Sequence, residues 1–248
     1  MKKIVLVTGS SKGIGAATAI LLAEQGFDIC INYLEDEESA NSVVESIKSL
    51  GVNAISVQAD VSKESEVVNL FNSIDQELGC VTSVVNNVGI LFQQMRLEEM
   101  DANRINKVFA SNVTGTFLCC REAVRRMSTA NGGQGGAIVN VSSVAARLGS
   151  PGEYIDYAAS KGAIDTLTKG LSIEVAMEGI RVNGVRPGFI KTEIHAKGGE
   201  PDRLKRIKPN IPMQRGGEAE EVAAAIAWLL SDEASYVTGT NIDVAGGR

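Results

Sequence analysis

Short apolar runs alternate with segments of helical period along almost the whole chain. The runs are rich in Val and Ile and nearly continuously apolar, which is typical of strands buried on both faces of a sheet. We expect strands at 3–8, 27–32, 53–58, 82–86, 137–141, 180–185 and 241–244. We expect helices at 13–25, 37–50, 63–78, 101–127, 157–177 and 219–230.

Regular alternation of strands and helices with short links predicts right-handed crossovers. The expected fold is α/β: a Rossmann-type, doubly wound parallel sheet in three layers. A chain of 248 residues can form one such domain, so we expect a single domain over 1–248. The alternation is interrupted at about 188–215, which holds three prolines and at most one short helix. Such long loops usually bind ligands, so we expect a substrate loop there.

The composition, 44% hydrophobic and 22% charged, is that of an ordinary globular protein. A net charge of −6 argues against a general nucleic-acid or anionic-membrane surface. The longest apolar helical stretch, 223–230, is too short to cross a bilayer. The 4 cysteines lack CxxC spacing, which favours reduced thiols. We therefore expect a cytoplasmic protein that binds neither nucleic acid nor membranes.

The first expected strand runs into the sequence TGSSKGIG, residues 8–15, and a helix follows at once. Gly9, Gly13 and Gly15 let the backbone turn tightly and approach a pyrophosphate without obstruction by a Cβ. The helix N-terminus adds free N–H groups and a partial positive charge. The junction of the first strand and first helix is where dinucleotide binding requires this pattern.

Polar residues also follow the third and fourth expected strands. Asp60 and Val61 follow the third, and the sequence NNVG, residues 86–89, follows the fourth. Open α/β sheets bind ligands at these carboxyl ends. Asp60 is a candidate partner for an adenine amine; its alternative is a solvent-exposed turn residue near the start of the next helix.

Tyr157 and Lys161 are four residues apart, so a helix projects both from one face. A free tyrosine has a pKa near 10 and is a poor base at neutral pH. An ammonium about 4 Å away contributes on the order of 4 kcal/mol at an effective dielectric of 20. We therefore expect Lys161 to lower the pKa of Tyr157 towards its working range, as general acid in reduction and general base in oxidation.

Five motifs in order resemble the short-chain dehydrogenase/reductase family. They are TGxxxGxG at 8–15, NNVG at 86–89, YxxxK at 157–161, RPG at 186–188 and the C-terminal 237–247. The likeness covers essentially the whole chain and is to the single-domain branch, which includes 3-oxoacyl-ACP reductases and glucose 1-dehydrogenases. It implies an NAD(P)-dependent oxidoreductase that transfers hydride between nicotinamide and a carbonyl/alcohol substrate.

The resemblance also implies roles for single residues. Tyr157 and Lys161 would act with Ser143, which orients the substrate carbonyl, and with Asn112, which positions a water in the proton relay. Lys161 would also hold the nicotinamide ribose. The implied cofactor-binding positions are Gly9, Ser11, Lys12, Gly13, Ile14, Gly15, Asn32, Asp60, Val61, Asn87, Gly89, Tyr157, Lys161, Pro187, Gly188, Ile190 and Thr192. Thr192 would contact the carboxamide; its alternative is the N-cap of a short loop helix.

Three positions leave alternatives open. The separation from Ser143 to Tyr157 is 157 − 143 = 14, one more than is usual in the family, so Ser142 competes for the role of catalytic serine. Tyr154 is a weaker rival for Tyr157, because no lysine stands four residues after it. Val88 replaces the usual alanine of the NNAG motif, and we expect it to tune the cofactor pocket.

Two signals bear on the choice of cofactor. Lys12 precedes the middle glycine, where NADP-preferring members of the family carry a base that faces the 2′-phosphate. NAD-preferring members end the second strand with Asp, whereas this chain has Asn32 and Tyr33. The acidic run 35–38 points the other way, but we interpret it as a solvated helix start. We therefore favour NADP(H), with NAD(H) possible.

The remaining candidates point to no other chemistry. His195 is the only histidine and cannot form a typical zinc site alone, so we expect no metal. A basic cluster in the expected loop, Arg203, Lys205, Arg206 and Lys208, is either solvated or meets an anionic acyl-carrier or CoA thioester. The resemblance suggests a homotetramer or homodimer formed through the mid-chain helices and the C-terminal segment. A catalytically silent redox sensor is the alternative function, although it would not need Tyr157 and Lys161 together.

Overall fold

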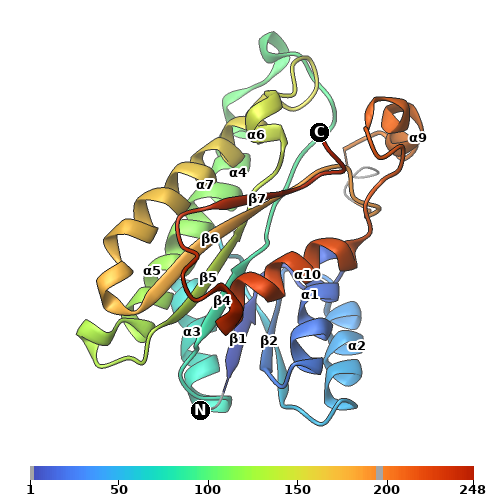
Figure 1. Ribbon diagram of the computed structural model, residues 1–248. Helices are drawn as coiled ribbons and strands as arrows, with labels where there is room; N and C mark the ends of the chain where they lie inside the picture. Colours follow the sequence, from blue (N-terminus) through green and yellow to red (C-terminus); the bar gives the residue numbers. More distant parts are fainter. Residues whose placement is uncertain (1–2, 194–197) are drawn as a thin grey trace.

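The computed structural model describes residues 3–193 and 198–248. Its strands form one parallel sheet of seven in the order β3-β2-β1-β4-β5-β6-β7 (Figure 1). The strands are β1 Ile4–Val7, β2 Asp28–Tyr33, β3 Ala54–Gln58, β4 Ser83–Asn86, β5 Gly136–Val141, β6 Ile180–Pro187 and β7 Asn241–Val244. The strand order reverses between β1 and β4, which places a topological switch point at the carboxyl end of β1.

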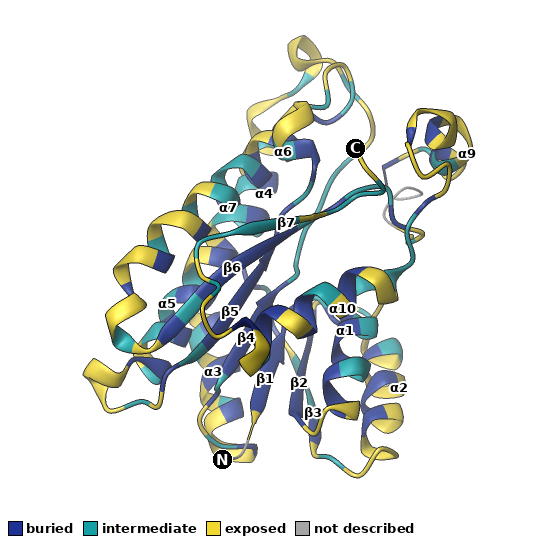
Figure 2. Ribbon diagram, in the orientation of Figure 1, coloured by how far each residue is buried: buried dark blue, intermediate teal, exposed yellow. Residues whose placement is uncertain are grey.

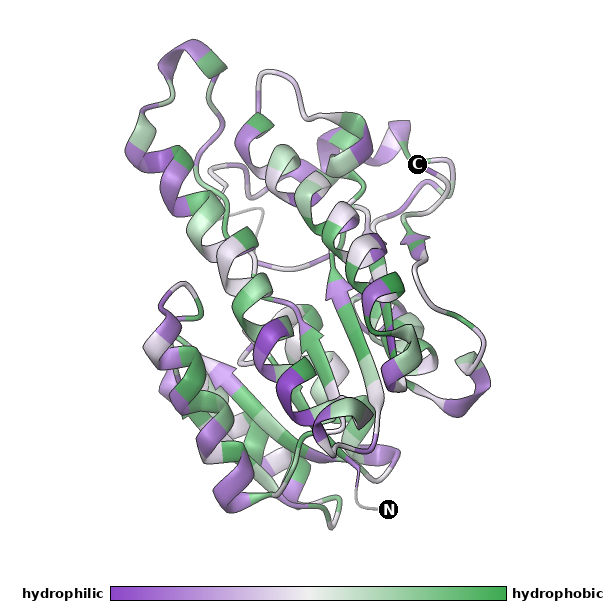
Figure 3. Cartoon of the chain, turned by 90° about the vertical axis from the view of Figure 1, so that its left-hand side faces the viewer, coloured by the Kyte–Doolittle hydropathy of each residue, from purple (hydrophilic) through white to green (hydrophobic). Residues whose placement is uncertain are grey.

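Helices cover both faces of the sheet, which confirms the doubly wound, three-layer fold. The helices on one face are α1 Gly13–Glu24, α2 Glu37–Lys48 and α10 Ala219–Leu230. The helices on the other are α3 Glu64–Glu77, α5 Gly115–Met127 and α7 Ile155–Glu174, with α4 Ala102–Phe109 leading towards α5. Figure 3 shows the strands as mostly hydrophobic, between helices that carry the hydrophilic residues.

Strand β1 shows how the sequence pattern creates these layers. Val5 and Val7 are fully buried against α1, α2 and α10, whereas Ile4 and Leu6 are buried in the cluster that contains α3 and α5. Successive side chains of a strand point to opposite faces, so an unbroken apolar run is buried on both sides. The dark central strands in Figure 2 show this burial across the sheet.

The helix expected over 101–127 contains a π-helical turn at Ala110–Thr114, between α4 and α5. Single π-turns of this kind are frequent at functional sites. A Cβ added at Gly115 would lie 2.8 Å from Val61 Cγ2, so a glycine lets this turn approach the loop after β3. The turn carries Asn112 into the interior, where it is fully buried.

The interruption after β6 contains the short helix α9 Arg203–Ile207 and a 3₁₀ turn at Lys208–Asn210. In Figure 1, α9 lies apart from the helical layers, beyond the carboxyl end of the sheet. A second short helix, α6 Ala145–Leu148, follows β5 and was not expected from the pattern. His195 lies outside the described residues.

Among the described residues, no helix is both long and apolar enough to cross a membrane. Cys30, Cys119 and Cys120 are buried and Cys80 is exposed, all with free thiols. No group of three or more potential metal ligands occurs in residues 3–193 and 198–248.

Candidate active site

The glycine turn lies between the end of β1 and the start of α1, next to the switch point. Gly9 and Gly13 have φ angles of +59° and +57°, which only glycine adopts readily. A Cβ added at Gly15 would lie 2.6 Å from both the Gly9 carbonyl oxygen and Asn87 Nδ2. Three glycines are therefore needed for the turn itself, and the first N–H groups of α1 face the carboxyl edge of the sheet.

Two asparagines, Asn32 in β2 and Asn87 just after β4, support Gly9 from the two strands that flank β1. The Gly9 N–H donates to Asn32 Oδ1 (3.2 Å), and Asn87 Nδ2 donates to the Gly9 carbonyl (2.9 Å). Asn32 also donates to the Ala59 carbonyl, so its amide ties β2 to the loop after β3. The resemblance implies that Asn32 and Asn87 bind the cofactor. In this structure both side chains bind the backbone of the glycine turn.

Val88 lies against the same turn, because a Cβ added at Gly9 would be 3.0 Å from its Cγ2. Thr192 lies on the other side, with its methyl carbon 3.4 Å from a Cβ added at Gly13. The loop after β6 thus reaches back over the glycine turn. Pro187, Gly188 and Ile190 lead from β6 into this loop, and Ile190 bridges to Gly217.

Asp60 occupies the turn before α3. Its carboxylate accepts hydrogen bonds from the Ser62 N–H (3.0 Å) and hydroxyl (2.7 Å). Its own N–H donates to Glu66 Oε2 (2.7 Å). These contacts fit the alternative reading of Asp60 as a turn residue at the helix start.

Tyr157 and Lys161 project from α7 towards the carboxyl end of β5. The Lys161 ammonium donates to the Val141 carbonyl (2.8 Å) and lies 5.6 Å from the centre of the Tyr157 ring. A Cβ added at Gly89 would lie 3.2 Å from this ammonium, so the NNVG segment passes directly beside it. The structure therefore brings the implied catalytic pair and the loop after β4 together.

The two adjacent serines at the end of β5 have different partners. The Ser142 hydroxyl is buried and donates to the Lys161 backbone carbonyl (3.1 Å), inside the α7–β5 contact. The Ser143 side chain is hydrogen-bonded to Tyr157, and its oxygen also accepts from the Ala145 N–H (3.1 Å). Of the two, Ser143 is the one that faces the tyrosine.

Asn112 is tied to its neighbours through both side-chain atoms. Its Oδ1 accepts from the Ile90 N–H (2.8 Å), and its Nδ2 donates to the Ile90 carbonyl and to Ser160 Oγ (both 3.0 Å). Ile90 directly follows the NNVG segment, and Ser160 directly precedes Lys161. Asn112 thus joins the loop beside the lysine to the helix that carries it.

The expected effect of Lys161 on Tyr157 is wrong for the protein alone. Burial raises the pKa of Tyr157 to about 12, and the hydrogen bond with Ser143 opposes this only in part. Burial also lowers the pKa of Lys161 to about 8, although the charge of Asp165 opposes this shift. Desolvation is the largest cause of both shifts, and it outweighs the attraction that the four-residue spacing suggests.

The expected substrate loop is anchored next to this pair. The buried Tyr154 hydroxyl donates to the Gly198 carbonyl (3.0 Å). The Arg203 guanidinium lies 4.8 Å from the centre of the Tyr154 ring and 5.5 Å from that of Phe189, and it pairs with Glu153. The sequence singled out Tyr154 only as a rival for Tyr157, and nothing in its spacing showed this anchoring contact.

The basic cluster of this loop is largely neutralised by acids. Arg203 pairs with Glu153 and Glu200, and Arg206 pairs with the same two carboxylates. Lys205 pairs with Asp202 (2.6 Å). Two arginines of the cluster therefore hold the loop against the segment before α7, which is not the arrangement of a free anion site.

A glycine turn at the switch point of a parallel sheet, together with a buried lysine beside a tyrosine and a serine, is typical of Rossmann-type oxidoreductases. Residues 9–248 match the family model described as enoyl-(acyl carrier protein) reductase. The chain belongs to the short-chain dehydrogenase/reductase family, whose members are oxidoreductases that bind a nicotinamide dinucleotide.

Three relatives match over almost their whole length. An uncharacterized oxidoreductase, YgfF, of Escherichia coli is 64% identical over 99% of both chains. Glucose 1-dehydrogenase 2 of Bacillus subtilis is 41% identical, covering 99% of this chain and 94% of the relative. The 3-oxoacyl-[acyl-carrier-protein] reductase FabG of Staphylococcus epidermidis is 37% identical, covering 100% and 99%.

Solved structures of the same fold are also similar. Acetoin dehydrogenase YohF from Salmonella typhimurium superposes with a TM-score of 0.87 at 35% identity, covering 100% of this chain and 97% of that one. A short chain dehydrogenase from Burkholderia cenocepacia, solved in complex with NADP, has a TM-score of 0.89 at 32% identity, with 99% and 97% covered.

Proposed function

We propose that this protein is an NADP(H)-preferring carbonyl reductase in which Tyr157 exchanges a proton with the substrate oxygen. The observation that carries the proposal is the cluster of half-buried Tyr157 and Ser143 with the buried Lys161, beside the NNVG segment that borders the glycine turn. Membership of an oxidoreductase family supports the reaction class.

The residues of the turn fit a dinucleotide. Gly9 and Gly13 would approach the pyrophosphate, with Ser11, Ile14 and Gly15 completing the turn at the start of α1. Asn87 and Gly89 would border the nicotinamide half, with Pro187, Gly188, Ile190 and Thr192 across from them. Lys12, with an exposed ammonium, would meet the 2′-phosphate. The NADP complex of a relative supports this choice of cofactor.

Bound nicotinamide supplies or accepts the hydride. The protein's own part is the proton: in reduction the Tyr157 hydroxyl donates it to the oxygen that develops negative charge. With a pKa of about 12, this phenol stays protonated at neutral pH and is ready to act as an acid. Ser143 would donate to the same oxygen, and the Lys161 charge would stabilise the phenolate that remains.

Asn112 would hold this arrangement together by fixing the loop beside Lys161. Its side chain is occupied by protein partners, so a water in the proton relay would have to use another of its groups, such as the backbone carbonyl, which already accepts from Thr116.

The substrate we favour is a small, uncharged ketone, bound under the loop at 188–215. Arg203 and Arg206 are paired with Glu153 and Glu200, so they offer little to an anionic acyl carrier. Relatives named as glucose 1-dehydrogenase and acetoin dehydrogenase act on neutral hydroxyl or carbonyl compounds, as their names indicate. Because another relative is named 3-oxoacyl-[acyl-carrier-protein] reductase, thioesters should also be tested as substrates.

The test is consumption of NADPH and NADH with ketones, sugars and acetoacetyl thioesters, comparing wild type with Tyr157→Phe. We expect the variant to bind NADPH normally but to lose about 10²- to 10⁴-fold in kcat. Tyr154→Phe is the matched control: it removes a phenol that donates to Gly198, so we expect KM to rise more than kcat falls. Equal kcat in wild type and Tyr157→Phe would rule out Tyr157 as the proton donor. Dinucleotide binding by the wild type without turnover of any compound in the panel would favour a silent dinucleotide sensor.

A further inference from the structure

Lys12 lies between two acidic loops at the rim of the glycine turn. Its ammonium is 2.7 Å from Asp36 Oδ2 and 3.7 Å from Glu193 Oε2. Asp36 stands between β2 and α2, whereas Glu193 follows Thr192 in the loop after β6. The cation that the sequence assigns to a 2′-phosphate therefore already has anionic partners within the protein.

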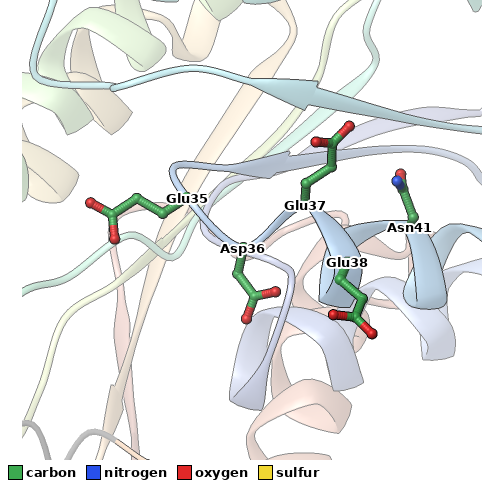
Figure 4. Close-up of a pocket in the computed structure, with 5 residues that line it drawn as sticks. All are labelled: Glu35, Asp36, Glu37, Glu38 and Asn41. Carbon is green, nitrogen blue, oxygen red and sulfur yellow. The ribbon is translucent and has the colours of Figure 1, made fainter.

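The surroundings of Asp36 are strongly acidic. An open hollow of about 660 Å³ is lined by Glu35, Asp36, Glu37, Glu38 and Asn41 (Figure 4). The Lys12 ammonium holds the pKa of Asp36 at about 2, and Asp36 in turn raises the pKa of Lys12. Both groups therefore stay charged throughout the physiological range.

We propose that Asp36 competes with the 2′-phosphate of NADP(H) for Lys12 and thereby limits the preference of this protein for NADP(H) over NAD(H). This inference rests on the proposed function. A bound 2′-phosphate must displace the Asp36 carboxylate from the ammonium and must also lie near the acidic run. A dinucleotide without that phosphate leaves the ion pair intact. Lys12 and the acidic run, which favour opposite cofactors in the sequence, then act together on one position of the dinucleotide.

Replacing the Asp36 carboxylate by the 2′-phosphate at Lys12 changes the binding free energy little, because one ion pair is lost as another forms. The Lys12 side chain is 47% exposed and that of Asp36 39%, and exposed ion pairs are weak and screened by salt. Removing the competitor is therefore expected to improve NADPH binding modestly and selectively. Glu193, at the longer distance, should contribute less.

The substitution Asp36→Asn removes the negative charge of this side chain without disturbing the fold. Asp36 is also the N-cap of α2, where its side chain accepts from the Ser39 N–H (3.0 Å). Asparagine is an equally good N-cap, so the helix start is preserved. Glu38→Gln is the matched control, because it removes the same charge from the same turn. In Figure 4 the Glu38 carboxylate points to the same side as that of Asp36, yet the described ion pairs of Lys12 do not include it.

The experiment measures equilibrium dissociation constants of NADPH and NADH at low salt, without substrate. We expect the ratio Kd(NADH)/Kd(NADPH) to rise about two- to fivefold in Asp36→Asn and distinctly less in Glu38→Gln. In a Lys12→Met background, Asp36→Asn should give no more than the control. High salt should reduce the gain.

Equal ratios in Asp36→Asn and Glu38→Gln would overturn the competition and leave the proposed reductase untouched. A gain of the same size in the Lys12→Met background would also overturn it, because the effect would then be general repulsion. Failure of the wild-type protein to bind either dinucleotide would instead overturn the proposed function.

Discussion

The Lys161 ammonium lies 5.6 Å from the centre of the Tyr157 ring, with the lysine buried and the tyrosine half-buried. Burial moves the two pKa values apart, lowering that of Lys161 to about 8 and raising that of Tyr157 to about 12. Each shift favours the neutral form of its group. The consequence is that the charge on Lys161, which would stabilise a Tyr157 phenolate, is lost within an accessible pH range.

Carbonyl reduction should therefore decline at moderately alkaline pH. Below pH 8 Lys161 is protonated, and above it the ammonium becomes neutral while Tyr157 still holds its proton. We expect kcat/KM for NADPH to be flat from about pH 6 to 7 and to fall above about pH 8. A pH profile in mixed buffers of constant ionic strength measures this.

Substitution of Asp165, whose charge raises the pKa of Lys161, tests whether the alkaline decline in kcat/KM is due to this lysine. Asp165→Asn should move the decline to lower pH. Asp243→Asn is the control, since Asp165 and Asp243 both pair with Arg186 but only Asp165 acts on Lys161. An identical profile in Asp165→Asn and wild type would mean that another group titrates.

Substitution of the two adjacent serines should have different consequences. Ser143→Ala removes the hydroxyl that is hydrogen-bonded to Tyr157, so we expect kcat to fall about 10²- to 10³-fold. The pKa seen in alcohol oxidation should rise, because the hydrogen bond lowers that of Tyr157. Ser142→Ala removes a bond to the Lys161 carbonyl and should cost about 1 kcal/mol of stability, with kcat changed only a few-fold. A larger loss of kcat in Ser142→Ala would reverse the assignment.

The layers of the fold could be predicted from the sequence because they follow from local periodicity. The unbroken apolar run of β1 fixes burial on both faces, and the final helix matches α10 at both ends, Ala219–Leu230. The glycine turn could be predicted as well, because the positive φ angles at positions 9 and 13 strongly favour glycine, so the conformation is reflected in the sequence. Such features depend on neighbours in the chain.

Features that depend on distant contacts could not be predicted. The pKa of Tyr157 is set mainly by burial in the folded chain, and spacing alone gave the wrong direction. The short helix α6 and the π-turn at Asn112 have no periodic signal. The acidic run was recognised as a helix start, which the cap at Asp36 confirms, but its pairing with Lys12 depends on how β2 and α1 pack.

The glycine turn should tolerate no side chain at Gly15. An alanine Cβ there would lie 2.6 Å from the Gly9 carbonyl oxygen and 2.8 Å from Ser10 Cα, and backbone cannot move aside cheaply. We expect Gly15→Ala to cost about 1–3 kcal/mol of stability and to weaken NADPH binding. Gly170→Ala in α7 is the control: it meets nothing within 4 Å and should stabilise the helix by about 0.5–1 kcal/mol. Thermal unfolding and dinucleotide titration report the two effects, and normal NADPH affinity in Gly15→Ala would contradict a pyrophosphate site at this turn.

The anchoring of the loop at 188–215 depends on Arg203, which is 6% exposed and lies between the rings of Tyr154 and Phe189. Arg203→Met removes its contacts with both rings and its pairing with Glu153, so the loop should close less well over the substrate. We expect KM for the carbonyl substrate to rise about tenfold, while Kd for NADPH changes less than about twofold, because the glycine turn is untouched. Lys205→Met in the same helix is the control: its side chain is 83% exposed and pairs with Asp202, so both constants should stay as in wild type. If KM were equally unchanged in Arg203→Met, this loop would not cover the substrate, and the neutral-ketone preference argued from its paired arginines would lose its basis.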